Sequence, residues 1–242
     1  MKPNIRPITL VCFSLLLVTF TIGTSVARAQ NTSGPDDDFI VRDGNAGYID
    51  LAIPGNQIRM IFDSGYGLNR PTRNEYFYAR RGPQGPGLPL PETNIDYQDA
   101  SIYMEQLVMD DVSAFIQVGS RSINPEINDN STGLSDMTLG VKAALVSTPD
   151  MVLSGQLKVS IPTGDATRGL GTNNVSIEPG LLLFAPVDDK LAVLGELRYW
   201  MPVDGTSFAG PVLRYGIGTQ YELYDSQSTK IVPVIELVGW TT

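Results

Sequence analysis

The chain has no histidine among its 242 residues, and its single cysteine is Cys12. A Ser-His-Asp nucleophile needs imidazole as its base, so that mechanism is excluded. Without histidine or a second cysteine, zinc and haem sites also lose their usual ligands. A pair of carboxylates can still exchange protons with a substrate, and Glu178 and Glu196 are the candidates. Such carboxylates more often pair with lysine and arginine, so we predict no catalytic residue, no metal and no cofactor.

Long apolar runs are missing too, except at the start of the chain. Lys2 and Arg6 precede an apolar stretch over residues 8–23, and residues 27–29 read Ala-Arg-Ala. This is the pattern of a secretory signal peptide, and we predict cleavage after it. An uncleaved membrane anchor is the alternative. Cleavage also removes Cys12, which leaves the mature chain without a thiol.

Basic residues are outnumbered by acidic ones. The chain has 17 lysines and arginines against 26 aspartates and glutamates, a net charge of −9. Three of the basic residues and none of the acidic ones lie in the predicted signal peptide, so the mature chain would carry 14 basic residues and a net charge of −12. An acidic surface argues against nucleic acid as a partner.

What the sequence does contain is a repeat of alternating segments. Residues 134–240 consist of segments of about ten residues in which apolar and polar side chains alternate. Leu139 and Val141 share one face, for example, and Lys142 lies on the other. The connections between segments are alternately short and long. This is typical of an outer-membrane β-barrel, in which one face of each strand meets lipid and the other a wet lumen.

The same alternation is present further upstream. Nine strands are predicted in all, over residues 57–65, 94–108, 112–121, 134–146, 151–161, 175–185, 191–201, 211–224 and 230–240. We therefore predict an all-β fold, an antiparallel transmembrane β-barrel. Bacterial single-chain barrels have even strand numbers, so we expect about 10–12 strands in the full protein and a chain truncated at its C-terminus. Alternatively, residues 48–53 form a tenth strand.

A soluble β-sandwich also has alternating strands. The charges at mid-strand positions and the rhythm of short and long turns favour the barrel.

The predicted organisation is a signal peptide over 1–29, a flexible leader or plug segment over 30–56, and a barrel over 57–242. The predicted lipid-facing side chains are Leu139, Leu157, Leu181, Leu197, Tyr215 and Ile235. On the opposite face, which is polar, we expect an arginine at Ser154 to be tolerated.

Two segments resemble a known family. Residues 133–142 read GLSDMTLGVK, and residues 161–165 read IPTGD, followed by GLGT at 169–172. Both resemble motifs of the outer-membrane barrels grouped as MetA-pathway phenol-degradation proteins, and segments nearer the start of the barrel resemble planctomycete members of that group. The resemblance covers roughly residues 57–242. It implies a barrel of the transporter type, but it implies no site residues.

The polar face carries five charges at similar predicted depths: Lys158, Glu178, Arg198, Arg214 and Glu236. One interpretation is a charged constriction that selects solutes, and its excess of one positive charge would favour anions. The other interpretation is a structural ladder of cross-strand ion pairs that fills a narrow barrel.

Three hypotheses for the function follow. The first is an outer-membrane channel or uptake protein for small solutes, with hydrophobic or aromatic ones suggested by the resemblance alone. The second is a barrel without flux that has a structural role or binds partners through its loops. The third is a secreted soluble β-sandwich binding module. The first two imply the outer membrane of a Gram-negative-type cell as the location. They imply the lipid bilayer, small solutes and, during insertion, the barrel-assembly machinery as partners.

Overall fold

The computed structural model describes residues 10–12, 47–68, 79, 85–203, 210–226 and 230–241. Most of the predicted signal peptide and of the predicted leader therefore lies outside the described residues. Among the described residues, no helix combines the length and the hydropathy that a membrane span needs.

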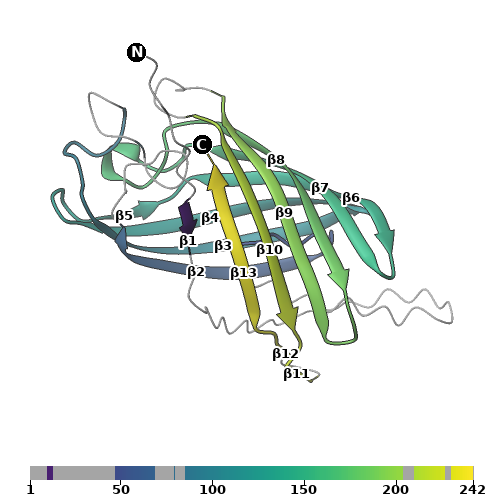
Figure 1. Cartoon of the computed structure of the whole chain (residues 1–242). Coiled ribbons are helices and arrows are strands. Elements are labelled where there is room, and N and C mark those ends of the chain that lie inside the picture. Colours follow the sequence, from purple (N-terminus) through teal and green to yellow (C-terminus); the bar gives the residue numbers. More distant parts are fainter. Residues whose placement is uncertain are drawn as a thin grey trace, which may run out of the picture.

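Nine long strands form one antiparallel sheet (Figure 1). Along the sheet they follow the order β13-β10-β9-β8-β7-β6-β4-β3-β2. The short β1 (Leu10–Cys12) pairs with β13, and β5 (Ser131–Leu134) pairs with β4. The long strands are β2 (Gln57–Leu68), β3 (Ile95–Met109), β4 (Val112–Pro125), β6 (Met137–Thr148), β7 (Met151–Ile161), β8 (Ser176–Pro186), β9 (Leu191–Pro202), β10 (Val212–Tyr221) and β13 (Val234–Thr241). The nine predicted strands and the all-β antiparallel fold are confirmed.

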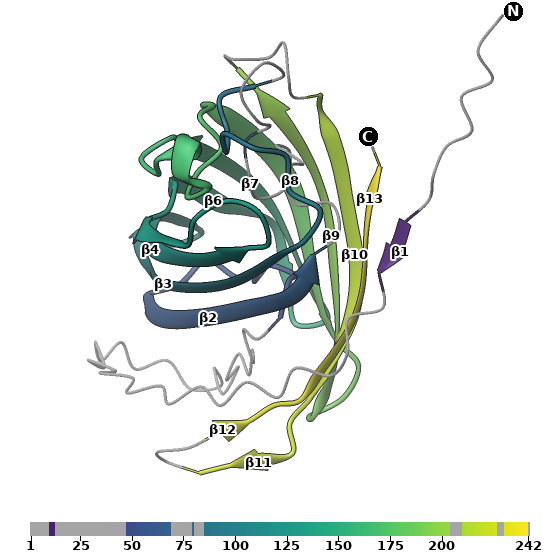
Figure 2. The same cartoon turned by 90° about the vertical axis from the view of Figure 1, so that its left-hand side faces the viewer.

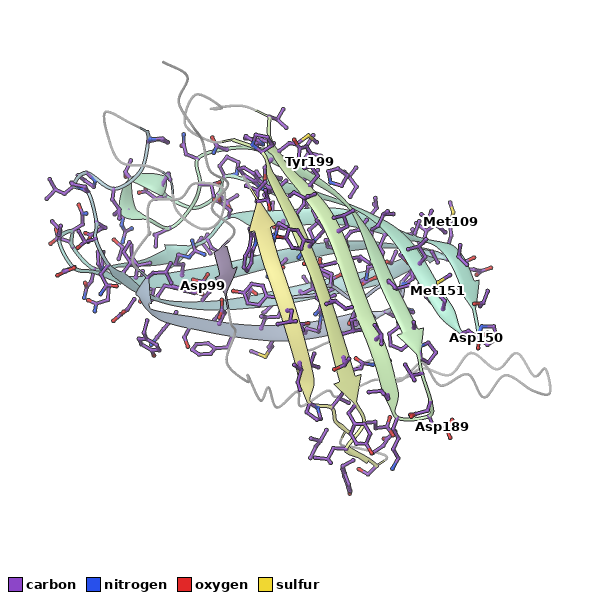
Figure 3. All side chains as sticks on the ribbon, viewed as in Figure 1. Asp99, Met109, Asp150, Met151, Asp189 and Tyr199 are labelled. Atoms are coloured by element: carbon purple, nitrogen blue, oxygen red, sulfur yellow. The ribbon has the colours of Figure 1, made fainter. Side chains whose placement is uncertain are left out.

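The sheet is strongly curled rather than flat (Figure 2). Its β2, β3 and β4 turn away from the plane of β9, β10 and β13, which gives the sheet a concave inner face and a convex outer face. Because the long strands belong to one sheet, the alternative of two sheets packed face to face is wrong. Asp150 and Asp189 lie in short turns at one end of the strands, whereas Tyr199 lies near the other end of β9 (Figure 3).

The two faces follow from the period of two in each strand, because successive side chains of a strand point to opposite sides. On the convex face the apolar side chains are exposed. The six side chains predicted to face outward are confirmed there, with exposed fractions from 36% to 65%: Leu139, Leu157, Leu181, Leu197, Tyr215 and Ile235. The concave face instead holds buried polar and charged side chains.

Two details differ from the sequence prediction. The connection after β4 is not an open loop, because β4 extends to Pro125 and pairs with β5 in a hairpin. The predicted ninth strand is split into β12 (Lys230–Ile231) and β13, and β12 pairs with β11 (Tyr224–Asp225). Pro233 lies at the break, where it has no N–H to donate to the ladder.

Candidate functional site

A short piece of chain before β2 lies against the concave face of the sheet. Residues 47–56, here called the inner segment, form no strand of their own. Their backbone is held by side chains of distant strands. The Ala52 carbonyl accepts a hydrogen bond of 2.5 Å from Ser154 Oγ, and the Ile53 carbonyl accepts one of 3.5 Å from Lys142 Nζ.

The start of the inner segment is bound by one carboxylate. Glu236 accepts hydrogen bonds from the backbone N–H groups of Tyr48, at 2.6 Å, and of Ile49, at 3.1 Å. Gly47 has φ of +116°, and a Cβ at this position would lie 2.4 Å from a Glu236 oxygen. The positive φ favours glycine at position 47, and a larger residue there would also push the Glu236 carboxylate aside. Glu236 therefore acts as an anchor for the inner segment.

Apolar contacts add to these polar ones. Ile49 and Ala52 are buried, and they belong to one core cluster with strand residues Val152, Leu182, Phe184, Ala192, Leu194 and Val238. On β10, Gly216 and Gly218 lie beneath Ile49, and a Cβ at either position would approach the Ile49 side chain to 3.2–3.3 Å. The inner segment is therefore packed into the sheet and not laid loosely over it.

Asp50 lies at the centre of the charged part of this face. Its carboxylate forms an ion pair with Lys158, and its Oδ2 lies 3.0 Å from Arg198 Nη1. Burial would raise the pKa of the Asp50 carboxyl, but the two cations outweigh burial and hold that pKa well below its usual range. Asp50 is therefore ionised at neutral pH.

The same cations contact strand carboxylates. Arg198 lies 3.0 Å from Glu178 Oε1 and 2.8 Å from Glu196 Oε2, and Arg214 lies 3.3 Å from Glu178 Oε2. This ion cluster holds three cations and three carboxylates: Lys158, Arg198, Arg214, Asp50, Glu178 and Glu196. The charges of the cluster balance. The positive excess expected from the sequence disappears because Asp50 and Glu196 join the cluster and Glu236 lies outside it.

The structure brings four of the five predicted lumen residues together and leaves one apart. Lys158 lies directly opposite Glu178 in the ladder between β7 and β8, and Arg198 lies directly opposite Arg214 between β9 and β10. Glu236 instead pairs with Gly218, four residues from Arg214 along β10. It contacts the inner segment and not the ion cluster.

A second buried charge pair lies near the end of the inner segment. Lys142 Nζ is 3.0 Å from Glu105 Oε1, and both side chains are almost fully buried. Glu105 also accepts hydrogen bonds from Ser113, Tyr103 and Gln57, and from the backbone N–H of Gly55. Sequence reasoning missed this pair as a site, although the period of two already placed Lys142 on the polar face.

The expectation for Ser154 is overturned. Its side chain is on the polar face, as predicted, but it is fully buried beneath the Ala52 carbonyl. An arginine at this position would have to displace the inner segment. The sequence predicted a flexible leader or plug segment over 30–56, with a tenth strand over 48–53 as an alternative. Residues 48–53 form no strand, so that alternative is wrong. The partners of residues 47–56 could not be predicted, because these residues follow no regular period.

These features define a class of protein: a curled antiparallel sheet with an apolar convex face and an ion-paired concave face. Residues 88–228 match the family described as "Putative MetA-pathway of phenol degradation", which is more than half of the chain. The chain belongs to that family, so the resemblance seen in the two sequence motifs is confirmed.

No curated protein matches the chain. Among solved structures, the crystal structure of the outer membrane channel DcaP of Acinetobacter baumannii aligns with a TM-score of 0.30 and 11% sequence identity. The alignment covers 81% of this chain and 66% of that channel, slightly less than two thirds of the channel's own length.

Proposed function

We propose that this protein is an outer-membrane β-barrel that acts as a channel or uptake protein for small solutes, and not as an enzyme. It would reach the outer membrane through a signal peptide cleaved after residue 29. The description of the family suggests hydrophobic or aromatic compounds among its solutes.

One observation carries this proposal, the distribution of apolar and charged side chains between the two faces of a single sheet. Large apolar side chains are exposed along the convex face, for example Ile58, Met60, Phe62, Val141, Ile217 and Leu237. Water does not favour such a continuous apolar surface, whereas lipid does. The charged side chains lie on the concave face, where a wet lumen or ion pairs can stabilise them.

The inner segment gives the channel a closed state. It covers the concave face where the ion cluster and the Lys142–Glu105 pair lie, and its polar contacts come from five different long strands. We propose that it acts as a plug, and that solute passage requires Asp50 to leave Lys158 and Arg198. The charged cluster would then line the open path and select solutes.

The experiment is a recording of single-channel conductance in planar bilayers, with the full-length protein extracted from outer membranes. The wild-type protein should show rare openings, and Asp50→Asn should show frequent ones, because the variant removes the ion pairs that hold the plug. Recovery of the protein in the soluble periplasmic fraction would contradict the proposal. So would the absence of conductance from both proteins.

A second function is favoured by the density of the ion pairs. Arg198 alone contacts three carboxylates, of Asp50, Glu178 and Glu196. Such a network can fill a narrow barrel completely and leave no path. The protein would then be a structural or surface-interaction barrel, and Asp50→Asn would lower its stability without producing conductance.

A further inference from the structure

A cavity of about 310 Å³ lies on the concave face, beside the connection that follows β7. This volume is near the lower end of the range for small-molecule sites. None of the described residues that line it is aromatic. Its wall includes a group of neutral hydroxyl and amide side chains: Ser101, Gln117, Ser135, Thr138, Ser160 and Ser176.

The cavity lies next to the ion cluster. Ser160 and Ser176 are directly opposite each other in the ladder between β7 and β8, and the neighbouring pair on the same face is Lys158 with Glu178. The inner segment contacts Lys158 and, further along β7, Ser154. The cavity therefore occupies the half of the concave face near the long connections, while much of the inner segment occupies the other half.

The charged groups in the cavity wall already have partners. Arg121 Nε and Nη2 donate to Asp99 at 2.8 Å and 2.5 Å. Asp136 accepts hydrogen bonds from the backbone N–H groups of Gly164 and Thr172, which fastens the connection after β7 over the cavity. Within the described part of the chain, no three acidic or sulfur- or imidazole-bearing side chains converge to hold a metal ion.

Asp63, the third carboxylate in the wall, accepts a hydrogen bond of 2.9 Å from the Tyr97 hydroxyl. Arg121 is the single cation among the described wall residues, so the three carboxylates make the wall net negative, which disfavours an anionic ligand. Beside them lies a set of neutral groups that can both donate and accept hydrogen bonds: serine and threonine hydroxyls and the Gln117 amide. Gln117 Nε2 lies 2.9 Å from Ser101 Oγ, so these two groups are placed side by side.

We propose that this cavity binds a small neutral polyhydroxylated solute, a polyol or a single sugar ring. Each hydroxyl of such a ligand is both donor and acceptor, as are the hydroxyls of the wall, and its size suits the cavity. This inference rests on the proposed function in one respect, since a channel would bring the solute to the cavity. It also narrows that function, because an aromatic solute would find no ring to stack on among the described wall residues.

The test is isothermal titration calorimetry on the full-length protein in detergent, with D-glucose as one probe and phenol as the other. Glucose should bind in a saturable way. Gln117→Leu should weaken glucose binding at least tenfold, because it removes the amide and leaves an apolar group in the wall. Gln98→Leu is the matched control, since Gln98 is exposed on the opposite face of β3, and it should bind glucose like the wild type.

Ser101→Ala is the second variant, in case Gln117→Leu does not fold. It removes only one oxygen and should weaken glucose binding several-fold. The inference is overturned if glucose gives no saturable heat, if both cavity variants bind it like the wild type, or if phenol saturates the cavity and glucose does not. Binding in detergent is independent of conductance in bilayers, so failure of this inference is distinct from failure of the channel proposal.

Discussion

The carboxylate of Asp50 lies 3.0 Å from the guanidinium of Arg198, although 148 residues separate the two in the chain. This contact joins the inner segment to the middle of β9. It places a negative charge where the strands alone would leave Lys158 and Arg198 with fewer partners. The neutrality of the ion cluster depends on Asp50, and the contact is one of those that hold the inner segment against the concave face.

Asp50→Asn should loosen the inner segment. The side chain is partly exposed, so we expect a loss of about 2 kcal/mol in docking, less than for a fully buried pair. That loss raises the population of the undocked segment about thirtyfold. Limited proteolysis within residues 47–56 should be faster by a similar factor. Asp150→Asn, in an exposed turn, is the control, and equal cleavage of both variants would contradict the prediction.

The docking of the inner segment should weaken in acid. The pKa of Asp50 is lowered in the folded protein, so its contribution is fully present above its ordinary pKa of about 3.9 and is lost as the pH falls below that value. Each further pH unit should remove about 1.4 kcal/mol. Proteolysis or conductance compared at pH 7, 4.5 and 3 checks this. Asp50→Asn should lack this part of the acid response, and an equal response in both proteins would argue against Asp50 as the titrating group.

Selectivity should follow the charge balance of the ion cluster. Arg214 is the more exposed of its two arginines. Arg214→Gln leaves two cations against three carboxylates, so the reversal potential of a conducting channel in a salt gradient should shift toward cations. Lys190→Gln, in the turn before β9, removes an equal charge far from the cluster and should shift the reversal potential little. An unchanged reversal potential in Arg214→Gln would favour the structural interpretation of the cluster.

The convex face should tolerate arginine only near the ends of the strands. Leu157→Arg and Leu181→Arg should each destabilise the inserted protein by about 2–4 kcal/mol if those positions lie near the middle of the bilayer. Thr148→Arg, exposed at the end of β6 and opposite Met151 on the convex face, should have an effect of about 0–1 kcal/mol. Urea unfolding in lipid vesicles, followed by heat-modifiable migration on gels, measures the difference. A soluble protein would show no such contrast.

The Lys142–Glu105 pair should be needed as a unit. Lys142→Met leaves a buried carboxylate without its cation, which should destabilise the protein by about 3–5 kcal/mol. The double variant with Glu105→Gln should recover part of that loss, since an amide can still bond with Ser113 and Tyr103. Denaturant unfolding of both variants gives the comparison, and a double variant less stable than Lys142→Met would refute the coupling.

Much of this fold could be predicted from the sequence, because the period of two is a local property of each strand. The alternation alone assigns Leu139 and Lys142 to opposite faces of one strand, and both assignments are right. The predicted strand bounds are right to within a few residues except where Pro233 interrupts a ladder and where β5 forms a hairpin with β4. Those two features depend on pairing partners that a single segment does not reveal.

The sequence by itself determined the all-β class, the two faces of each strand and the shared face of Lys158, Glu178, Arg198, Arg214 and Glu236. Only the tertiary structure decided which of those charges meet, because strand register sets their relative depth and the curl of the sheet brings distant strands together. It also decided that residues 47–56 cover the concave face. The contacts of Asp50 with Lys158 and Arg198 are long-range, and a short segment without a periodic pattern does not reveal the partners of its charged residue.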